Sequence, residues 1–151
     1  MLANACGKNG MVEGQILDIS ENKSLSIEDL DYMHSKKTGS LIKTCLEMGG
    51  LISHLPDEEI NLLSEYGEKV GLAFQIRDDI IDLQSPTEIS GKTQGADILQ
   101  HKITYPNLIG IERSKKMTIE LCEEAQETVR KLSGDSTKLI ELSDFVCSRN
   151  Y

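Results

Sequence analysis

The sequence is poor in aromatic residues and contains no long apolar run. Of its 151 residues 4% are aromatic, none is tryptophan, and only four are valine. Because β-branched and aromatic side chains favour strands, this composition argues against an extensive sheet. No apolar run reaches the ~20 residues that a membrane-spanning helix needs, and residues 1–15 lack the hydrophobic segment of a signal peptide. We therefore expect a chain with no membrane span.

Basic residues are scarce as well. Sixteen Lys and Arg stand against 25 Asp and Glu, for a net charge of −9. Nucleic acids and anionic membrane surfaces attract basic segments, so neither is an expected partner. The four cysteines are far apart, with no CxxC pair and no adjacent histidine cluster. This spacing fits neither a zinc motif nor a dense disulfide framework, and it predicts a cytoplasmic location.

Leucine and isoleucine are abundant, 34 residues together, and they recur at helical spacing. The pattern predicts helices over residues 1–19, from Ser26 to about Gly50, from Pro56 to about Leu83, over 106–133 with a break near Ile111, and over 136–148. Residues 85–105 have little periodicity, which predicts a long ordered loop, and such loops are usually functional. The expected fold is all-α, a single domain built as a bundle of long helices.

The strongest candidate site is an acidic segment in the third predicted helix. At about 100° per residue, Gln75, Asp78, Asp79 and Asp82 lie within one 100° arc. Like charges at this spacing destabilise a helix by about 0.2–0.5 kcal/mol per pair, so a cation is needed to offset them. Oxygen ligands suit Mg²⁺ or Mn²⁺ better than zinc. A solvated acidic face is the alternative, and the apolar residues flanking the segment favour the metal site.

Lysines near glycine or threonine form a second candidate set. Lys37-Thr38-Gly39 lies within a predicted helix, and Gly91-Lys92-Thr93 lies in the predicted loop. The second motif is not a P-loop, because Pro86 stands where the first glycine should be and no strand precedes it. Any one of these lysines alone is most simply an exposed side chain. Together with bound metal ions, this set of Lys36, Lys37, Lys92 and Lys102 is suited to hold a diphosphate.

Five motifs in order resemble the C-terminal half of the short-chain trans-prenyltransferases, the farnesyl diphosphate synthase type. Gly14 to Asp18 resembles the GQxxD helix of that family, and Lys37-Thr38-Gly39 resembles its KT(G/A) motif. Phe74 to Asp82 resembles its second aspartate-rich motif, FQxxDDxxD. The later matches are Gly91-Lys92 with Asp97, Lys102 and Thr104-Tyr105-Pro106, then the segment Cys147 to Tyr151.

This resemblance implies the isoprenoid synthase fold and a Mg²⁺-dependent prenyl diphosphate synthase. In that reaction an allylic diphosphate ionises, isopentenyl diphosphate attacks the carbocation, and a proton is lost. The resemblance assigns the metal, Mg²⁺ or Mn²⁺, to Asp78, Asp79 and Asp82. It assigns the allylic diphosphate to Lys37, Thr38, Gln75, Lys92 and Lys102, and catalysis to Lys37, Thr38 and Gln75. It gives Gln15, Asp18 and Asp97 a supporting role, next to the residues that contact the metal and the diphosphate.

One half of the family pattern is missing. Asp-Asp-x-x-Asp occurs once, at 78–82, and no Arg-Arg pair exists. Residues 1–151 therefore correspond to the C-terminal half of a single synthase domain, and we expect this chain alone to be inactive. Such a half should expose an apolar face of the order of several hundred Å², covered by a homo-oligomer or by the N-terminal half. The alternatives are one subunit of a split synthase and a non-catalytic helical module that binds or regulates a synthase.

Overall fold

The computed structural model describes residues 1–20, 26–84 and 103–150. Within these ranges every regular element is a helix, which confirms the all-α prediction. The elements are α1 (Leu2–Cys6), α2 (Met11–Ile19), α3 (Ile27–His34), the π-helix η1 (Ser35–Gly39), α4 (Ser40–Ile52), α5 (Asp57–Gln84), α8 (Tyr105–Ile109), α9 (Ile111–Val129) and α10 (Thr137–Ser148).

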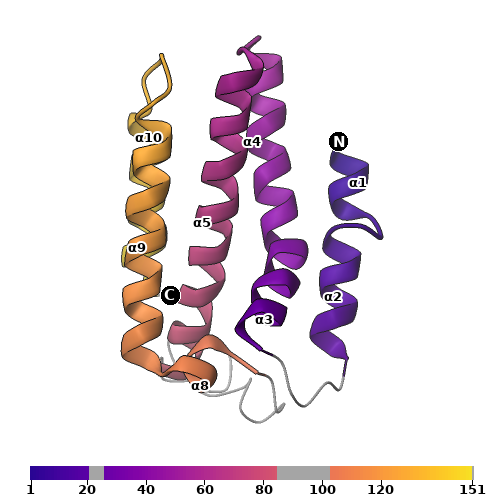
Figure 1. Ribbon diagram of the computed structural model, residues 1–151, viewed down its shortest axis with the longest axis vertical. Coiled ribbons are helices and arrows are strands. Elements are labelled where there is room, and N and C mark those ends of the chain that lie inside the picture. The colour runs from indigo at the N-terminus through magenta and orange to yellow at the C-terminus, as the bar shows by residue number, and fades with distance from the viewer. Residues whose placement is uncertain (21–25, 85–102, 151) are drawn as a thin grey trace.

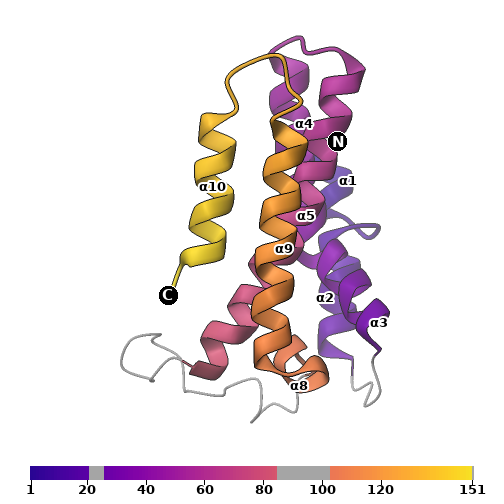
Figure 2. The same ribbon diagram turned by 60° about the vertical axis from the view of Figure 1, so that its left-hand side comes forward.

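The long helices stand side by side with α5 in the middle (Figure 1). Helix α5 packs against α4 on one side and α9 on the other, while α2 packs against η1. Figure 2 shows α10 beside α9, on the side away from α1 and α2. The last turns of α2 and α5, the first turn of α3 and the short helix α8 all lie at the lower end of Figure 1. Residues distant in sequence are therefore collected at that end.

Two apolar clusters hold α5 in place. The first joins α5 to α9 and α10 through Tyr66, Val70, Ala73, Cys122, Ala125, Val129 and Val146. The second lies nearer the lower end and is made of Leu30, Met33, Ile76, Ile80 and Tyr105. Each fully buried aliphatic or aromatic side chain contributes about 1.5–3 kcal/mol of transfer free energy. The second cluster matters for the site, because it packs α3 and α8 directly against the aspartate-rich end of α5.

The predicted helix from Ser26 begins as expected but is not uniform. Ser26 caps α3: its hydroxyl accepts a hydrogen bond from the Asp29 amide, and the Asp29 carboxylate accepts one from the Ser26 amide. The helix then passes through η1 and continues to Ile52, two residues past the predicted end at Gly50. Short π-helical turns are rare in proteins, and those that occur are often found at functional sites. This one carries the Lys37-Thr38-Gly39 motif.

The prediction of one helix over residues 1–19 is wrong. The chain forms α1 and α2 with a turn at residues 7–10 between them. A Cβ atom on Gly10 would lie 2.1 Å from the Ala5 carbonyl oxygen, so only glycine fits the backbone there. The periodic pattern of apolar residues continues through this turn, which is why periodicity alone does not show the break.

Much of the apolar stripe of α2 lies on the surface. Met11, Val12, Ile16 and Ile19 are exposed, while Gly14 is buried on the opposite side of the helix. This arrangement agrees with the expectation of an uncovered apolar face. In the described ranges, no helix is both long enough and apolar enough to cross a lipid bilayer.

The later helices match their predicted positions with one difference. Gly110, at φ 83°, separates α8 from α9, close to the break predicted near Ile111. A positive φ strains any residue with a Cβ atom, so glycine is suited to this position. Helix α9 ends at Val129 rather than 133, and α10 begins at Thr137, within one residue of its predicted start. Residues 85–102 of the predicted loop lie outside the described residues.

Candidate active site

The side chains of Thr38 and Gln75 meet where η1 packs on α5. The Thr38 hydroxyl donates a hydrogen bond to Gln75 Oε1 at 2.6 Å. Gln75 is only 9% exposed, and the backbones are close because Gly39 lies opposite Gly71: a Cβ on Gly71 would come within 3.0 Å of the Gly39 Cα. The hydroxyl oxygen of Thr38 keeps its lone pairs for another partner, because it acts as the donor in this bond.

Lys37 is held by an aspartate of helix α2. Its Nζ lies 2.8 Å from Asp18 Oδ2, and the Asp18 side chain is 10% exposed. The contact depends on Gly14, because a Cβ atom at that position would lie 2.2 Å from the Lys37 amide nitrogen. Two residues of the GQxxD motif therefore have distinct roles here: Gly14 allows α2 to approach η1, and Asp18 orients the lysine. Gln15 is exposed on the apolar side of α2.

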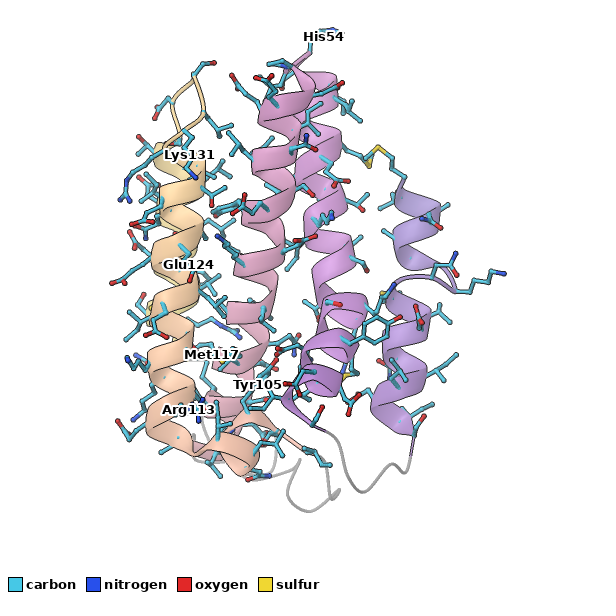
Figure 3. All side chains as sticks on the ribbon, in the orientation of Figure 1. His54, Tyr105, Arg113, Met117, Glu124 and Lys131 are labelled. Carbon is cyan, nitrogen blue, oxygen red and sulfur yellow. The ribbon has the colours of Figure 1, made fainter. Side chains whose placement is uncertain are left out.

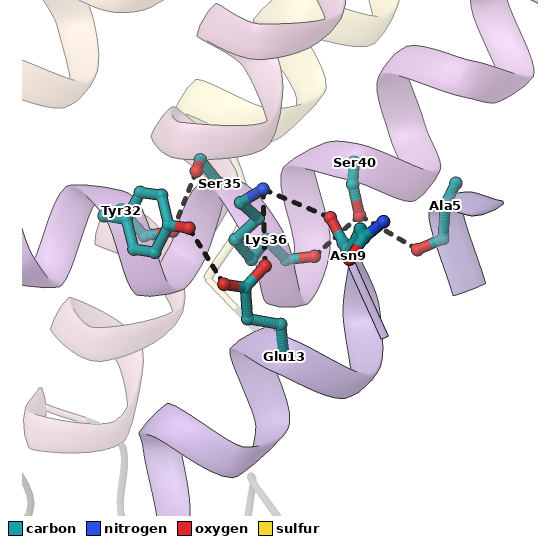
Figure 4. Close-up of polar contacts among 7 residues, drawn as sticks. All are labelled: Ala5, Asn9, Glu13, Tyr32, Ser35, Lys36 and Ser40. Atoms are coloured by element: carbon teal, nitrogen blue, oxygen red, sulfur yellow. Dashed lines mark hydrogen bonds and ion pairs between the residues drawn. The ribbon is translucent and has the colours of Figure 1, made fainter. Parts of the chain in front are cut away.

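Lys36, the neighbour of Lys37, points to a different set of partners (Figure 4). Its Nζ lies 3.4 Å from Glu13 Oε2 and donates to the Asn9 carbonyl oxygen at 3.1 Å. The Tyr32 hydroxyl donates to the other oxygen of Glu13 at 2.9 Å, and the ammonium lies 5.2 Å from the Tyr32 ring centroid. Lys36 thus fastens α2 to the start of η1.

Asp79 is buried against α8. Its Oδ2 accepts a hydrogen bond from the Tyr105 amide at 3.0 Å, and the residue is 8% exposed. The Tyr105 hydroxyl donates to Asp31, and its ring stacks on His34 at a centroid distance of 5.7 Å. Burial, with the neighbouring Asp31 carboxylate, raises the pKa of Tyr105, so the hydroxyl stays protonated as a donor. Tyr105 lies at the lower end of the bundle in Figure 3 and connects α8, α3 and α5.

Asp78 has different neighbours from Asp79 and meets the segment after α10. Arg149 Nη2 lies 3.1 Å from Asp78 Oδ1, and the Asp78 side chain remains 45% exposed. The guanidinium also lies 3.9 Å from the centroid of the Phe74 ring. The neighbouring Arg77 contacts the same segment, and its Nε donates to the Arg149 carbonyl oxygen at 2.7 Å.

The structure brings together only part of the predicted site. Thr38 meets Gln75, and Lys37 meets Asp18, but Asp78 and Asp79 have separate partners and Asp82 is half-buried between them. In the ranges that the structure describes, no three His, Cys, Asp or Glu side chains lie close enough to hold one metal ion. Lys92, Asp97 and Lys102 lie outside the described residues.

Three contributors were not predicted as site residues from the sequence. Tyr105 stood within the recognised Thr-Tyr-Pro motif, but nothing in its spacing indicated that it would fasten Asp79. Arg149 stood within the matched segment Cys147 to Tyr151, and Asp31 carries no local signal. Their contacts with Asp78 and Tyr105 span 71 and 74 positions of the chain, so no local pattern indicates them.

Comparisons with known proteins identify the family of the chain. A family described as polyprenyl synthetase matches residues 2–142. The chain is 38% identical to a farnesyl diphosphate synthase of Micrococcus luteus over 151 residues, covering 99% of this chain and 52% of that protein. It is 37% identical to a Helicobacter pylori geranyltransferase complexed with magnesium and isoprenyl diphosphate, with a TM-score of 0.79, covering 96% of this chain and 48% of that one.

More distantly related proteins share this fold. A heptaprenyl diphosphate synthase from Staphylococcus aureus superposes with a TM-score of 0.89 at 22% identity, over 93% of this chain and 57% of that one. The chain spans about half the length of the curated relatives it matches. With the motifs at residues 14–18, 37–39 and 74–82 on packed helices of the isoprenoid synthase fold and a family match along nearly its whole length, the chain belongs to the polyprenyl synthetase family.

Proposed function

We propose that this chain provides the diphosphate-binding and metal-binding half of a Mg²⁺-dependent prenyl diphosphate synthase. The observation that carries the proposal is the group at the junction of η1 and α5: the Thr38–Gln75 hydrogen bond, with Lys37 one residue before Thr38 and Asp78 three residues after Gln75. It is supported by the family match and by the relatives named as farnesyl diphosphate synthases. A cytoplasmic location stays a prediction.

The carboxylates divide into two roles in this proposal. Asp78 is half-exposed and offers an oxygen to a divalent cation, while buried Asp79 fastens α8 through the Tyr105 amide. Mg²⁺ in proteins is usually bound by one or two carboxylates, with substrate phosphates and water completing the shell. The described residues bring no three protein ligands together, and this fits Mg²⁺ with Asp82 as the second candidate carboxylate. Bound Mg²⁺ would stabilise the negative charge of the departing diphosphate.

Lys37 is suited to the substrate diphosphate. Its ammonium carries three donors, of which the Asp18 carboxylate takes one at 2.8 Å. The remaining donors and the charge are available to an anion, and Asp18 limits the side chain to one orientation. Lys92 and Lys102 are proposed as further cations for the same diphosphate. Gln15 and Asp97 stay proposed supporting residues.

Thr38 and Gln75 are proposed to act on the carbocation. The allylic C–O bond breaks with its electron pair leaving on the diphosphate, and the double bond of isopentenyl diphosphate then forms the new C–C bond. The oxygens of Thr38 and Gln75 are held by their mutual hydrogen bond, and fixed dipoles aimed at a developing charge need no reorganisation. The released diphosphate is the base that takes the proton, completing the elimination.

Reconstitution with the N-terminal half of a relative tests this function. The chain is mixed with the N-terminal half of the Micrococcus luteus relative, geranyl and isopentenyl diphosphates and Mg²⁺, and prenyl products are measured. We expect no product from the chain alone and product from the mixture. Lys37→Met should abolish it, while Lys36→Met, which removes the neighbouring lysine bound to Glu13, should leave most of it.

Two results would contradict the proposal. Product from the 151-residue chain alone would show that the N-terminal half found in the relatives is dispensable. Diphosphate binding that is insensitive to Mg²⁺, with no product in the mixture, would instead indicate a non-catalytic binding module.

A further inference from the structure

The segment after α10 places a positive charge on the aspartate-rich end of α5. Arg149 Nη2 lies 3.1 Å from Asp78 Oδ1 and donates to the Phe74 carbonyl oxygen at 3.2 Å. The guanidinium lies over the Phe74 ring, 3.9 Å from its centroid, and the Arg149 side chain is only 9% exposed. The guanidinium is therefore anchored on the same helix face as the proposed metal ligand.

A second arginine holds the main chain of this segment. Arg77 Nε donates to the Arg149 carbonyl oxygen at 2.7 Å, and its Nη2 donates to Asn150 Oδ1 at 2.9 Å. Arg77 and Asp78 are adjacent on α5, so one residue binds the backbone of the segment and the next binds its side chain. The position of residues 149–150 is thus determined by the aspartate-rich motif itself.

One hydrogen-bond donor of Arg149 has no acceptor among the described residues. Arg149 Nε is buried and has no hydrogen-bond acceptor in the part of the chain that the structure describes. A buried donor without an acceptor costs free energy. Asp78 remains 45% exposed, so a cation can reach the carboxylate from solvent without unfolding the segment first. A cation from solvent can therefore compete with Arg149 for this carboxylate.

We propose that Arg149 is a positioning residue that occupies Asp78 in the metal-free chain and releases it when a divalent cation binds. The inference rests on the proposed function, since it takes Asp78 as a metal ligand. A guanidinium and a divalent cation are both positive and compete for one carboxylate. Cation binding therefore frees Arg149 from α5, and the guanidinium in turn lowers the affinity of Asp78 for the cation.

Trypsin cleavage after Arg149 reports directly on this exchange. In the metal-free chain the buried side chain should be cut slowly, whereas exposed Lys131 in the turn after α9 should be cut readily (Figure 3). Mn²⁺ should speed cleavage at Arg149 by about two- to fivefold without changing cleavage at Lys131, the range expected for losing one ion pair. Asp78→Asn should expose Arg149 without any metal. Intact-mass spectrometry follows both cuts.

Mn²⁺ binding, measured as free Mn²⁺ by electron paramagnetic resonance, gives the second readout. Arg149→Met should tighten binding by about two- to fivefold. Asp78→Asn should weaken it, and the matched control Arg113→Met, an exposed arginine on α9, should leave it unchanged.

The outcomes distinguish failure of the Arg149 exchange from failure of Asp78 as a metal ligand. If Asp78→Asn weakens Mn²⁺ binding while Arg149→Met equals wild type, and Mn²⁺ does not alter cleavage at Arg149, the exchange is overturned and the metal site stands. If Asp78→Asn binds Mn²⁺ like wild type, the assignment of Asp78 as a metal ligand fails, and the exchange fails with it.

Discussion

Adjacent residues in the aspartate-rich motif have opposite environments. Asp78 is half-exposed beside Arg149, whereas Asp79 is buried and accepts the Tyr105 amide. The sequence predicted that both would lie on one arc of the helix, and they do. It could not predict that the two edges of this arc face different neighbours, because Tyr105 and Arg149 lie 26 and 71 positions away.

This difference predicts unequal costs of substitution. Asp79→Ala leaves the buried Tyr105 amide without its acceptor, so the free energy of unfolding should fall by about 1–3 kcal/mol. Asp78→Ala removes a partly exposed ion pair and should cost less than about 1 kcal/mol. Urea denaturation followed by circular dichroism measures both. Equal losses would mean that the two carboxylates do not divide into these roles.

The cysteines should differ in reactivity. Burial raises the pKa of Cys122 from 9.0 to about 12, whereas Cys45 is exposed. The thiolate is the reactive form, so iodoacetamide at pH 8 should modify Cys45 and spare Cys122 in the folded chain. Peptide mass spectrometry locates the label. Equal labelling of both thiols under native conditions would show that the core around α9 opens.

The same shift affects stability at alkaline pH. The folded-state pKa of Cys122 lies above its ordinary value, so the stability it contributes is intact below about pH 9 and is lost as pH rises toward 12. Burial raises the pKa of Tyr66 and Tyr105 in the same direction. The free energy of unfolding should therefore fall over this interval, with Cys122→Ala reducing the slope. A flat profile would contradict the assignment.

At the scale of elements, close approach of helices positions the lysine. A Cβ at position 14 would lie 2.2 Å from the Lys37 amide nitrogen, whereas nothing lies within 4 Å of one at Gly49. Gly14→Ala should therefore cost about 1–3 kcal/mol through overpacking and separate Asp18 from Lys37. The control Gly49→Ala, in the exposed part of α4, should stabilise the chain by about 0.5–1 kcal/mol. Thermal melts of both variants measure these changes. A Gly14→Ala variant with the stability of the wild type would contradict the tight α2–η1 contact.

Sequence patterns predicted long, capped helices better than their interruptions. Pro56 and three acidic residues marked the start of α5, and the predicted end at Leu83 is one residue from the observed Gln84. The turn at residues 7–10 and the π-helix η1 were missed. Neither feature interrupts the periodic pattern of apolar residues. The turn involves a close steric contact at Gly10, and the π-helix packs against α2 and α5.

At the scale of the whole molecule, the apolar stripe of α2 is uncovered. Met11, Val12, Ile16 and Ile19 are exposed together with Leu2 of α1. Uncovered apolar faces of this kind favour association, so we expect the isolated chain to self-associate. Ile16→Lys with Ile19→Lys should shift sedimentation velocity toward the monomer while leaving the melting temperature nearly unchanged. A wild-type chain that sediments as a single monomer would contradict this expectation.

The family could be inferred from the sequence because its motifs are short and local, and those at residues 14–18, 37–39 and 74–82 each lie on one helix. The contacts that complete the site were not predictable, because they join residues far apart in the chain, such as Thr38 with Gln75 and Lys37 with Asp18. The resemblance pointed to the same residues without specifying which partner each one meets.

Pyrophosphate binding measured by calorimetry, with and without Mg²⁺, tests the central claim most directly. The account predicts that Mg²⁺ strengthens binding to the wild-type chain by at least about tenfold, equivalent to 1.4 kcal/mol, and that Asp78→Asn abolishes this gain. Equal affinity in the presence and absence of Mg²⁺, or a gain that survives Asp78→Asn, would contradict it.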